Sequence, residues 1–386
     1  MNRRKKFVLT FLTTLVVLAL SFGLIYAGGF LIVTNTGVPY KWDPAQPVPY
    51  NPDQGMLGVL TNAQAVQLVD DNVKLWDNQH IPTSSLSFTN AGSLPIDVQT
   101  AADFAQFDSK NDSINPVIFD VDGSLLDDLG FDPGVLGFAS VEFIRTIAPF
   151  YILEGKAVLN GNWIDGDSTD GVETTVEVMG STLTHEIGHY LNLDHTQVNG
   201  QFFIGDDDDP GFVTYGDPTP QSTNLMFPFF LGLPGEPTAP NTDDIQTISA
   251  LYPAGGFPAA FGTIEGSVFE SDGTTPFAGA DVIARNVTDP FGDAVSRVSG
   301  ALFNPGAQFP TGGSPDPALE GQYELPGLSP GASYTVEIVQ VNPRFTGGSG
   351  VGPIDPPAIL PSFEEFWNGT SEGATTADNP LDAQNV

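Results

Sequence analysis

Three of the four histidines in this 386-residue chain fall within one short segment, His185-Glu-Ile-Gly-His189-Tyr-Leu-Asn-Leu-Asp-His195. On an α-helix, His185 and His189 share one face, about 6 Å apart along the axis. His195 reaches that face only if the helix has ended and the chain has turned back. Asn192 suits such a turn, because a positive φ is needed there and asparagine tolerates it best after glycine. The segment therefore predicts a helix, a tight turn and three converging imidazoles.

Three neutral imidazoles with one coordination position left open are the ligand set of a catalytic zinc site. We therefore expect one zinc ion held by His185, His189 and His195. Glu186 follows the first ligand and is placed to take a proton from a water at the metal, as a general base does. The fourth histidine, His80, stands in a loop-like segment, Asn78-Gln-His-Ile-Pro82, and is not expected to bind metal.

The spacing of hydrophobic residues divides the chain into two parts with different predicted secondary structure. The first part predicts helices and strands in an α+β arrangement, with helices over 62–76, 176–193 and 243–251 and strands over 116–119, 135–139 and 157–160. The second part predicts short strands separated by Gly, Pro and Ser, typical of a small all-β sandwich, at 263–269, 280–285, 322–325 and 333–341. The boundaries that follow are a catalytic domain over 28–255, a linker over 256–260, a β-sandwich over 261–343 and a Gly/Pro-rich acidic tail over 344–386.

The N-terminus predicts export. Residues 2–6 carry four positive charges, and an apolar run follows from Phe7 to Ala27. These are the first two regions of a signal peptide over 1–27, with cleavage after Ala27. The run is about 20 residues long, enough to span a bilayer, so an uncleaved anchor is the alternative. Either way, we expect the remainder to be secreted, extracellular or at the cell surface.

Charge and composition exclude several classes of protein. The chain has 12 Lys and Arg against 47 Asp and Glu, a formal net charge of −35, and no Cys. Such acidity argues against binding nucleic acid or anionic lipid, because both carry phosphate. The lack of Cys excludes disulfides, thiolate-bound zinc and a thiol nucleophile. We expect protein or peptide substrates, membrane contact only through an uncleaved N-terminal segment, and a monomer.

The histidine segment resembles the zinc-binding motif of the metzincin peptidases, with Asn192 where that family usually has glycine. Further on, Asn224-Leu-Met226-Phe-Pro-Phe-Phe230 resembles the Met-turn of the matrixins within that family. The resemblance implies that Met226 forms an apolar floor beneath the zinc. It also implies that Pro228 and Phe230 line the pocket for the substrate side chain after the scissile bond.

Asp243-Asp-Ile-Gln-Thr-Ile-Ser-Ala-Leu-Tyr252 resembles the C-terminal helix of matrixins. By that resemblance Asp244 supports the Met-turn or a matured N-terminus; a simple acid at a helix start is the alternative. The family fold implied is a twisted, mostly parallel sheet with an antiparallel edge strand, an active-site helix and a C-terminal helix. Residues 135–140 occupy the place of that edge strand, where substrate would add as an antiparallel strand.

Two further expectations concern calcium and the second domain. Calcium is a candidate structural ion, with oxygens from Asp120 and Asp122, from Asp165, Asp167 and Asp170, or from the Asp206–Asp209 run. A solvated loop is the commoner explanation for acids of this kind. The 260–343 segment resembles sandwich domains of the carboxypeptidase-regulatory type. It contains no histidine, so we expect a spacer, stabilising or surface-binding role.

Taken together, these patterns predict a secreted zinc-dependent endopeptidase that hydrolyses peptide bonds of proteins, with Glu186 as its general base. The alternative is a catalytically inactive surface adhesion or binding protein with a vestigial peptidase fold, a hypothesis that the C-terminal sandwich and acidic tail motivate. A thermolysin-like enzyme, whose third ligand is a downstream glutamate, is disfavoured because His195 already fills that role.

Overall fold

The computed structural model describes residues 29–386 except 170, 308–312, 353 and 370–384. The predicted signal peptide, residues 1–27, therefore lies outside the described residues. Within the described part of the chain, no helix combines the length and apolar character needed to cross a membrane. The fold is mixed, with one mostly parallel sheet and two antiparallel sheets, which agrees with the predicted α+β class.

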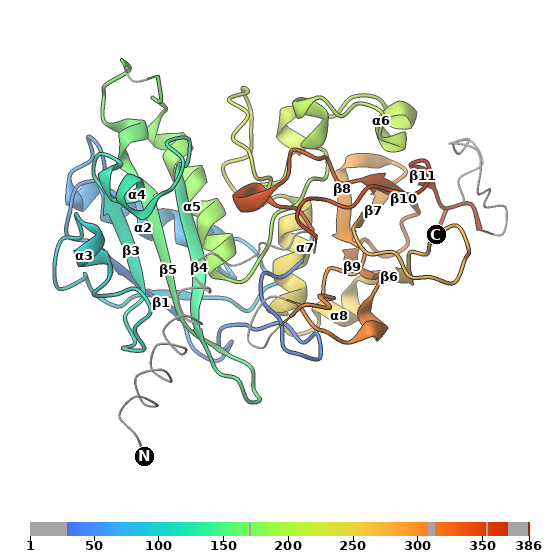
Figure 1. Cartoon of the computed structure of the whole chain (residues 1–386), viewed down its shortest axis with the longest axis horizontal. Coiled ribbons are helices and arrows are strands. Elements are labelled where there is room, and N and C mark those ends of the chain that lie inside the picture. The colour runs from blue at the N-terminus through green and yellow to red at the C-terminus, as the bar shows by residue number, and fades with distance from the viewer. Residues whose placement is uncertain (1–28, 170, 308–312, 353, 370–384) are drawn as a thin grey trace, which may run out of the picture.

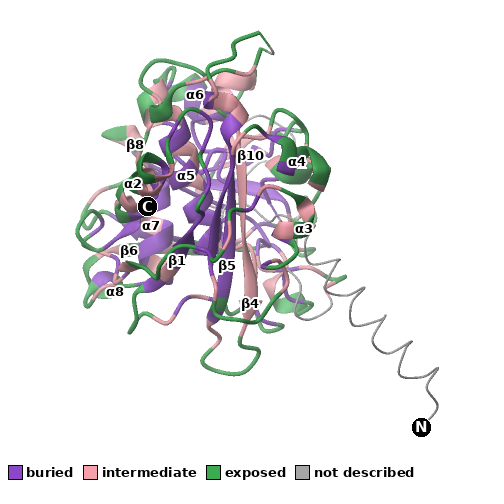
Figure 2. Cartoon of the chain, turned by 90° about the vertical axis from the view of Figure 1, so that its left-hand side faces the viewer, coloured by how far each residue is buried: buried purple, intermediate pink, exposed green. Residues whose placement is uncertain are grey.

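The first half of the chain is built on a five-stranded sheet of order β2-β1-β3-β5-β4. Its strands are β1 (Val48–Pro52), β2 (Phe88–Asn90), β3 (Pro116–Asp120), β4 (Gly137–Ile144) and β5 (Ile152–Asn160). Pairing is parallel from β2 to β5, whereas β4 runs antiparallel to β5 at the edge. The edge strand predicted at 135–140 thus lies a few residues further along. Figure 2 shows β5 buried along most of its length and β4 half-buried throughout.

Alternate residues of the central strands face two different cores, as the two-residue period of a strand requires. Val117 and Phe119 of β3, with Leu159 of β5, contribute to the core that contains the long helices. Ile118 and Val158 point the other way, into a smaller core beneath the short helices α3 and α4. The sheet is therefore the middle of three layers, which explains the apolar runs at 117–119 and 157–159 in its central strands.

Helices α2 (Asn62–Asn72), α5 (Val176–Tyr190) and α7 (Thr242–Leu251) match the three predicted from spacing. The first continues to Trp76 as a 3₁₀ turn, and α5 ends three residues before the predicted 193. The shorter helices are α3 (Ala101–Phe104), α4 (Ser124–Leu129), α6 (Pro210–Tyr215) and α8 (Phe257–Ala260), with 3₁₀ turns at Val73–Trp76, Gly161–Ile164, Gln201–Ile204, Pro220–Ser222, Pro317–Leu319 and Gly347–Ser349.

The second half forms a sandwich of two antiparallel sheets, ordered β11-β10-β7-β8 and β6-β9. Their strands are β6 (Gly262–Ser267), β7 (Ala280–Asn286), β8 (Asp289–Val298), β9 (Gln322–Leu328), β10 (Tyr334–Gln340) and β11 (Glu365–Phe366). Side chains of both sheets meet in one core, including Val282, Val295, Leu325 and Val336. Figure 1 shows the sandwich on one side, the five-stranded sheet on the other and α7 between them.

Three parts of the second half differ from the sequence prediction. Strand β8 was not expected, because its first half carries Pro290 and Gly292, which are unfavourable in strands. Helix α8 occupies the predicted linker 256–260. Strand β11 pairs with β10, so the sandwich sheet extends past the predicted boundary at 343 into the predicted tail.

The two halves share polar contacts along α7. The Thr242 hydroxyl donates to the Gly292 carbonyl oxygen at 2.6 Å. One carboxylate oxygen of Asp243 accepts the Ser296 amide at 2.9 Å and lies 4.0 Å from the Arg297 guanidinium. The Thr242 contact is exposed, whereas Asp243, Ser296 and Arg297 are buried, so this part of the interface resembles the interior of a single fold rather than a loose linkage between domains.

Charged groups are also buried where the sandwich meets the loop after α5. Arg285 is fully buried and pairs with Glu337 at 2.5 Å and with Asp209 at 3.6 Å. Nearby, Asp281 is fully buried, and one of its oxygens accepts the Gln197 side-chain amide at 3.0 Å. Burial raises the pKa of Asp281 to about 7. The carboxylates thus outnumber their buried cationic partner, which favours proton uptake on folding.

The excess of buried carboxyl groups over buried cations predicts that the fold loses stability as pH rises. The Asp281 carboxyl loses its proton near pH 3.8 when unfolded but holds it to about pH 7 when folded. The unfolded chain therefore binds fewer protons than the folded chain in this range. The stability that the protonated Asp281 contributes to the folded state is lost as pH rises through 7. We expect Asp281→Asn to raise the free energy of unfolding at pH 8 by on the order of 1–3 kcal/mol, with little change at pH 4. Urea unfolding of the wild type and the variant at both pH values measures the change in unfolding free energy. An equal change at pH 4 and pH 8 would contradict the raised pKa of Asp281.

Candidate metal centre

Helix α5 carries the first two histidines, and its start is fixed by a side-chain cap. The hydroxyl of Thr175 accepts the Val178 amide, which satisfies one of the free donors of the first turn. Met179, Leu183 and Ile187 bury one face in the main core. The helix is therefore anchored along its length, and its orientation sets the positions of His185 and His189.

The turn after α5 has the geometry predicted for Asn192, with φ at 79°. The Leu193 amide donates to the Gly188 carbonyl at 2.9 Å, and the Asn192 amide to the His189 carbonyl at 2.9 Å. This is the hydrogen-bond pattern of a Schellman motif, which ends a helix and reverses the chain. The reversal brings His195 back to the face that carries the other two histidines.

Asn192 does more than glycine would at this position. Its side-chain amide donates to the carbonyls of Ile32 and Tyr40 at 2.9 and 2.7 Å, and its oxygen accepts the Ile32 amide at 2.8 Å. The turn is thereby tied to the N-terminal stretch that precedes β1. Sequence reasoning identified the backbone role of Asn192 but not this side-chain role, because its partners lie about 150 to 160 residues away in the chain.

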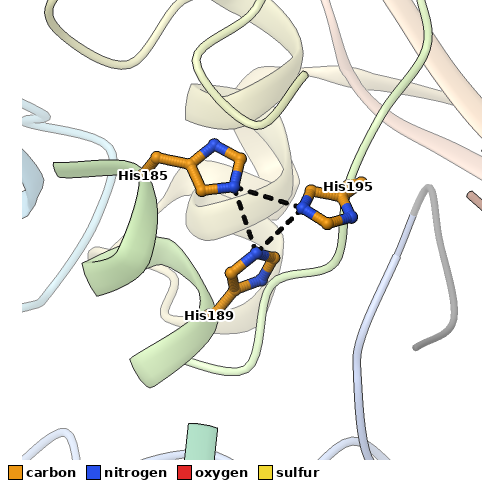
Figure 3. A group of neighbouring side chains, drawn as sticks. All are labelled: His185, His189 and His195. Atoms are coloured by element: carbon orange, nitrogen blue, oxygen red, sulfur yellow. Dashed lines mark hydrogen bonds between the residues drawn. The ribbon is translucent and has the colours of Figure 1, made fainter. Parts of the chain in front are cut away.

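The three histidines converge through their Nε2 atoms. The Nε2–Nε2 distances are 3.1 Å between His185 and His189, 3.2 Å between His185 and His195, and 3.0 Å between His189 and His195 (Figure 3). Three nitrogens at 2.0–2.1 Å from one tetrahedral ion would be about 3.3–3.4 Å apart. The observed triangle is within a few tenths of an ångström of that size.

Backbone carbonyls hold the other nitrogen of each ring. Nδ1 of His185 donates to the Leu225 carbonyl at 2.7 Å, and Nδ1 of His189 to the Leu193 carbonyl at 2.9 Å. Nδ1 of His195 donates to the Gly350 carbonyl at 3.0 Å. Because a carbonyl oxygen only accepts, each Nδ1 carries the proton and each Nε2 of a neutral ring presents a lone pair. Three lone pairs pointing at one another repel unless a cation lies between them, so the residues fit a metal ion.

Burial favours the neutral form of these rings. It lowers the pKa of His185 to about 4 and of His189 to about 3, and it lowers the pKa of His195 well below its usual value. The rings are therefore uncharged near neutral pH, which is the state in which imidazole binds a metal.

Glu186 lies on the same turn of α5 and is 6 % exposed. The Ala139 amide of edge strand β4 donates to its carboxylate, while Oε2 is buried without a hydrogen-bond partner. Burial raises the pKa of Glu186 to about 8. An unpartnered buried carboxylate oxygen is costly, which makes it a candidate for contact with something the site binds.

Met226 is buried in the main core and packs against Gly188 of α5. A Cβ atom added to Gly188 would lie 2.3 Å from the Met226 sulfur, so the close approach depends on glycine at that position. Asp244 holds this turn by accepting the Leu225 amide at 2.7 Å and the Met226 amide at 3.1 Å. It also accepts the Asn241 amide at 2.8 Å, so it serves both the Met226 turn and the start of α7.

The residues after Met226 divide into a packed and an exposed set. Phe227 is buried, and the ring of Phe229 stacks on Phe345 with centroids 5.5 Å apart. Phe230 is 45 % exposed, and Pro228 is half-buried. Their predicted role in a substrate pocket stays a prediction.

Two residues at the site were not singled out from the sequence. Asp194 is buried and accepts the His195 amide at 2.7 Å. It directly precedes the third histidine, and this adjacency could have identified it from the sequence as a residue of the site. Gly350 lies in the predicted tail, and nothing local indicates that its carbonyl reaches His195.

The other expected metal sites have less support. His80 is exposed beside Asp77, in the loop where it was predicted. Among the residues that the structure describes, the three histidines are the only group of three or more candidate side-chain ligands that converge. The calcium sites therefore stay predictions, and Asp170 lies outside the described residues.

Comparison with known proteins adds no family to this geometry. A scan against protein-family models and a search of curated proteins each found no match. What is established is a three-histidine cluster on an α+β fold that could hold a metal ion.

The turn at Asn192 gives a test with a matched pair of variants. Asn192→Gly keeps a residue that accepts positive φ but loses three side-chain hydrogen bonds, whereas Asn192→Ala loses both. We expect both variants to destabilise the fold, with alanine worse than glycine by about 1 kcal/mol. Denaturant unfolding of both variants measures the difference. Alanine and glycine variants of equal stability would show that the φ requirement is unimportant.

Proposed function

We propose that this chain is a zinc-dependent endopeptidase of the metzincin class, matrixin-like, that is exported and hydrolyses peptide bonds of proteins. One observation carries the proposal: three Nε2 lone pairs converge while each Nδ1 is committed to a backbone carbonyl. Such a set of neutral nitrogen donors suits zinc, and three protein ligands leave a coordination position for chemistry. Export rests on the predicted signal peptide at 1–27.

Glu186 is the residue that would move the proton. Zinc, when bound, supplies a Lewis acid that polarises a carbonyl and makes water a stronger acid. The positive charge of a bound zinc ion would lower the pKa of Glu186 and favour its ionised form. The Glu186 carboxylate would then take a proton as the water oxygen adds to the carbonyl carbon of the peptide. It then passes that proton to the nitrogen of the leaving amine as the C–N bond breaks. The second proton of the water passes from the new carboxyl group to the amine, so the products are a carboxylate and a protonated amine, and Glu186 returns to its starting state.

The edge strand β4 offers a place for an extended substrate. It ends the five-stranded sheet, is half-buried along its whole length, and passes beside Glu186 through the Ala139 amide. A peptide adding antiparallel to β4 would gain main-chain hydrogen bonds and run past the histidines. This arrangement favours a substrate recognised mainly through its backbone, which fits unfolded or extended segments of proteins.

Replacement of Glu186 separates catalysis from metal binding. We expect Glu186→Gln to retain one zinc per chain but to cleave an unstructured protein such as denatured casein at least about 10²-fold more slowly than the wild type. The full chain, loaded with zinc, is assayed with and without a zinc chelator, and metal content is measured in parallel. The glutamine variant keeps the shape of the side chain, so a lost rate reports the lost base.

His189→Ala is the matched control, because it should lose both zinc and activity. A Glu186→Gln protein that cleaves at the wild-type rate would contradict the role of Glu186. A wild-type chain that binds zinc but cleaves nothing would favour the inactive binding protein with a vestigial peptidase fold.

A further inference from the structure

We propose that the chain segment Val341–Val351, the C-terminal strap, is a positioning element of the metal centre. The carbonyl of Gly350 in this strap fixes the ring of His195. The strap leaves the sandwich directly after β10 and returns to the first half of the chain, and in Figure 1 the red segment beyond β10 reaches back toward α5. This inference rests on the proposed metal centre and assigns part of it to the C-terminal half.

The strap supplies the hydrogen-bond acceptor for Nδ1 of His195. The Nδ1 acceptors of His185 and His189 are the carbonyls of Leu225 and Leu193, 40 and 4 residues away in sequence and both in the first half of the fold. The acceptor for His195 is Gly350, which is 155 residues away in sequence. His195 is buried, so its Nδ1–H has no ready access to solvent as an alternative acceptor.

The hydrogen bond to Gly350 selects the tautomer of His195. A neutral imidazole carries one proton, and the carbonyl retains it on Nδ1. Without that acceptor the proton is free to move to Nε2, where it would block the lone pair that faces the metal. Partners that orient a metal-bound histidine in this way typically affect metal affinity 10- to 100-fold.

Buried side chains hold the strap in place. Phe345 is 1 % exposed, stacks on Phe229 and meets Phe227 edge-on at 5.7 Å between ring centroids. Val341 and Val351 at the two ends of the strap are buried in the same cluster. Because Phe227 follows Met226 directly, one aromatic group fixes both the strap and the turn beneath the site.

Polar contacts complete the anchoring. The Gly350 amide donates to the Gly347 carbonyl at 2.9 Å, which closes a 3₁₀ turn and directs the Gly350 carbonyl. The Arg344 guanidinium donates to the Ile204 carbonyl at 2.7 Å, and the Asn342 amide to the Gln197 side-chain oxygen at 3.2 Å. Both acceptors lie in the loop that follows His195, so the strap is docked on the ligand's own segment.

Phe345→Ala in the full chain tests the proposal, with Phe366→Ala as the matched control. Phe366 is an equally buried phenylalanine in β11, at 0 % exposure, whose ring faces Tyr215 rather than the strap. We expect Phe345→Ala to weaken zinc binding 10- to 100-fold in competition with a chromophoric chelator and to alter the visible spectrum of the cobalt-substituted protein. Phe366→Ala should change zinc affinity less than about twofold, and Phe345→Leu should restore most of it. Equal affinities in the two alanine variants would overturn the proposal.

A second measurement needs no variant of the strap. The chain has four histidines, so ¹⁵N-histidine labelling of the zinc-loaded wild type gives a simple spectrum. We expect the His195 proton on Nδ1, with slow exchange against solvent. A proton on Nε2, or rapid exchange, would overturn the role of Gly350.

Both measurements read metal binding, so they separate the strap from the peptidase. Weaker zinc binding in Phe345→Ala supports the strap even if the chain cleaves no substrate. A wild-type chain that binds no zinc would overturn the metal centre and the strap together.

Discussion

Three hydrogen bonds from histidine Nδ1 atoms to backbone carbonyls are the interaction on which the site depends. Each bond fixes a ring and its tautomer, and together they direct three lone pairs to one point. The acceptors come from three places, namely the turn after α5, the turn that contains Met226, and the strap after β10. A correct site therefore requires the helix, the Met226 turn and the sandwich to be placed together, which explains why buried polar contacts join the two halves.

Asp244 and Asn192 show how the fold supports these acceptors. Asp244 binds the amides of Leu225 and Met226, so the start of α7 sets the position of the carbonyl that receives His185. Asn192 reverses the chain and binds residues before β1, so the N-terminal stretch sets the path of the chain toward His195. Both side chains are buried and hydrogen-bonded, which makes them rigid supports. Beside the three ligands, Glu186 Oε2 and Asp194 Oδ2 are instead buried without a hydrogen-bond partner.

The sequence predicted the local parts of this arrangement and missed the long-range ones. The spacing of His185, His189 and His195 indicated a helix, a turn and convergence, because the helical period fixes which residues share a face. Strands β3 and β5 were recognised from their apolar runs, whereas β1 and β2 were not predicted and β8 was hidden by Pro290 and Gly292. The contact between His195 and Gly350 could not be predicted, because a backbone carbonyl leaves no trace in residue type and the two positions are 155 residues apart.

The most direct test of the account is X-ray absorption spectroscopy at the zinc edge on the purified full chain with one equivalent of zinc. The account predicts a single zinc environment with three imidazole nitrogens at about 2.0–2.1 Å and light-atom scattering from the remaining position. The same spectrum from His195→Ala should lose one imidazole. A wild-type spectrum without imidazole scattering, or a chain that retains no zinc after desalting, would contradict the claim that the three histidines form a metal centre.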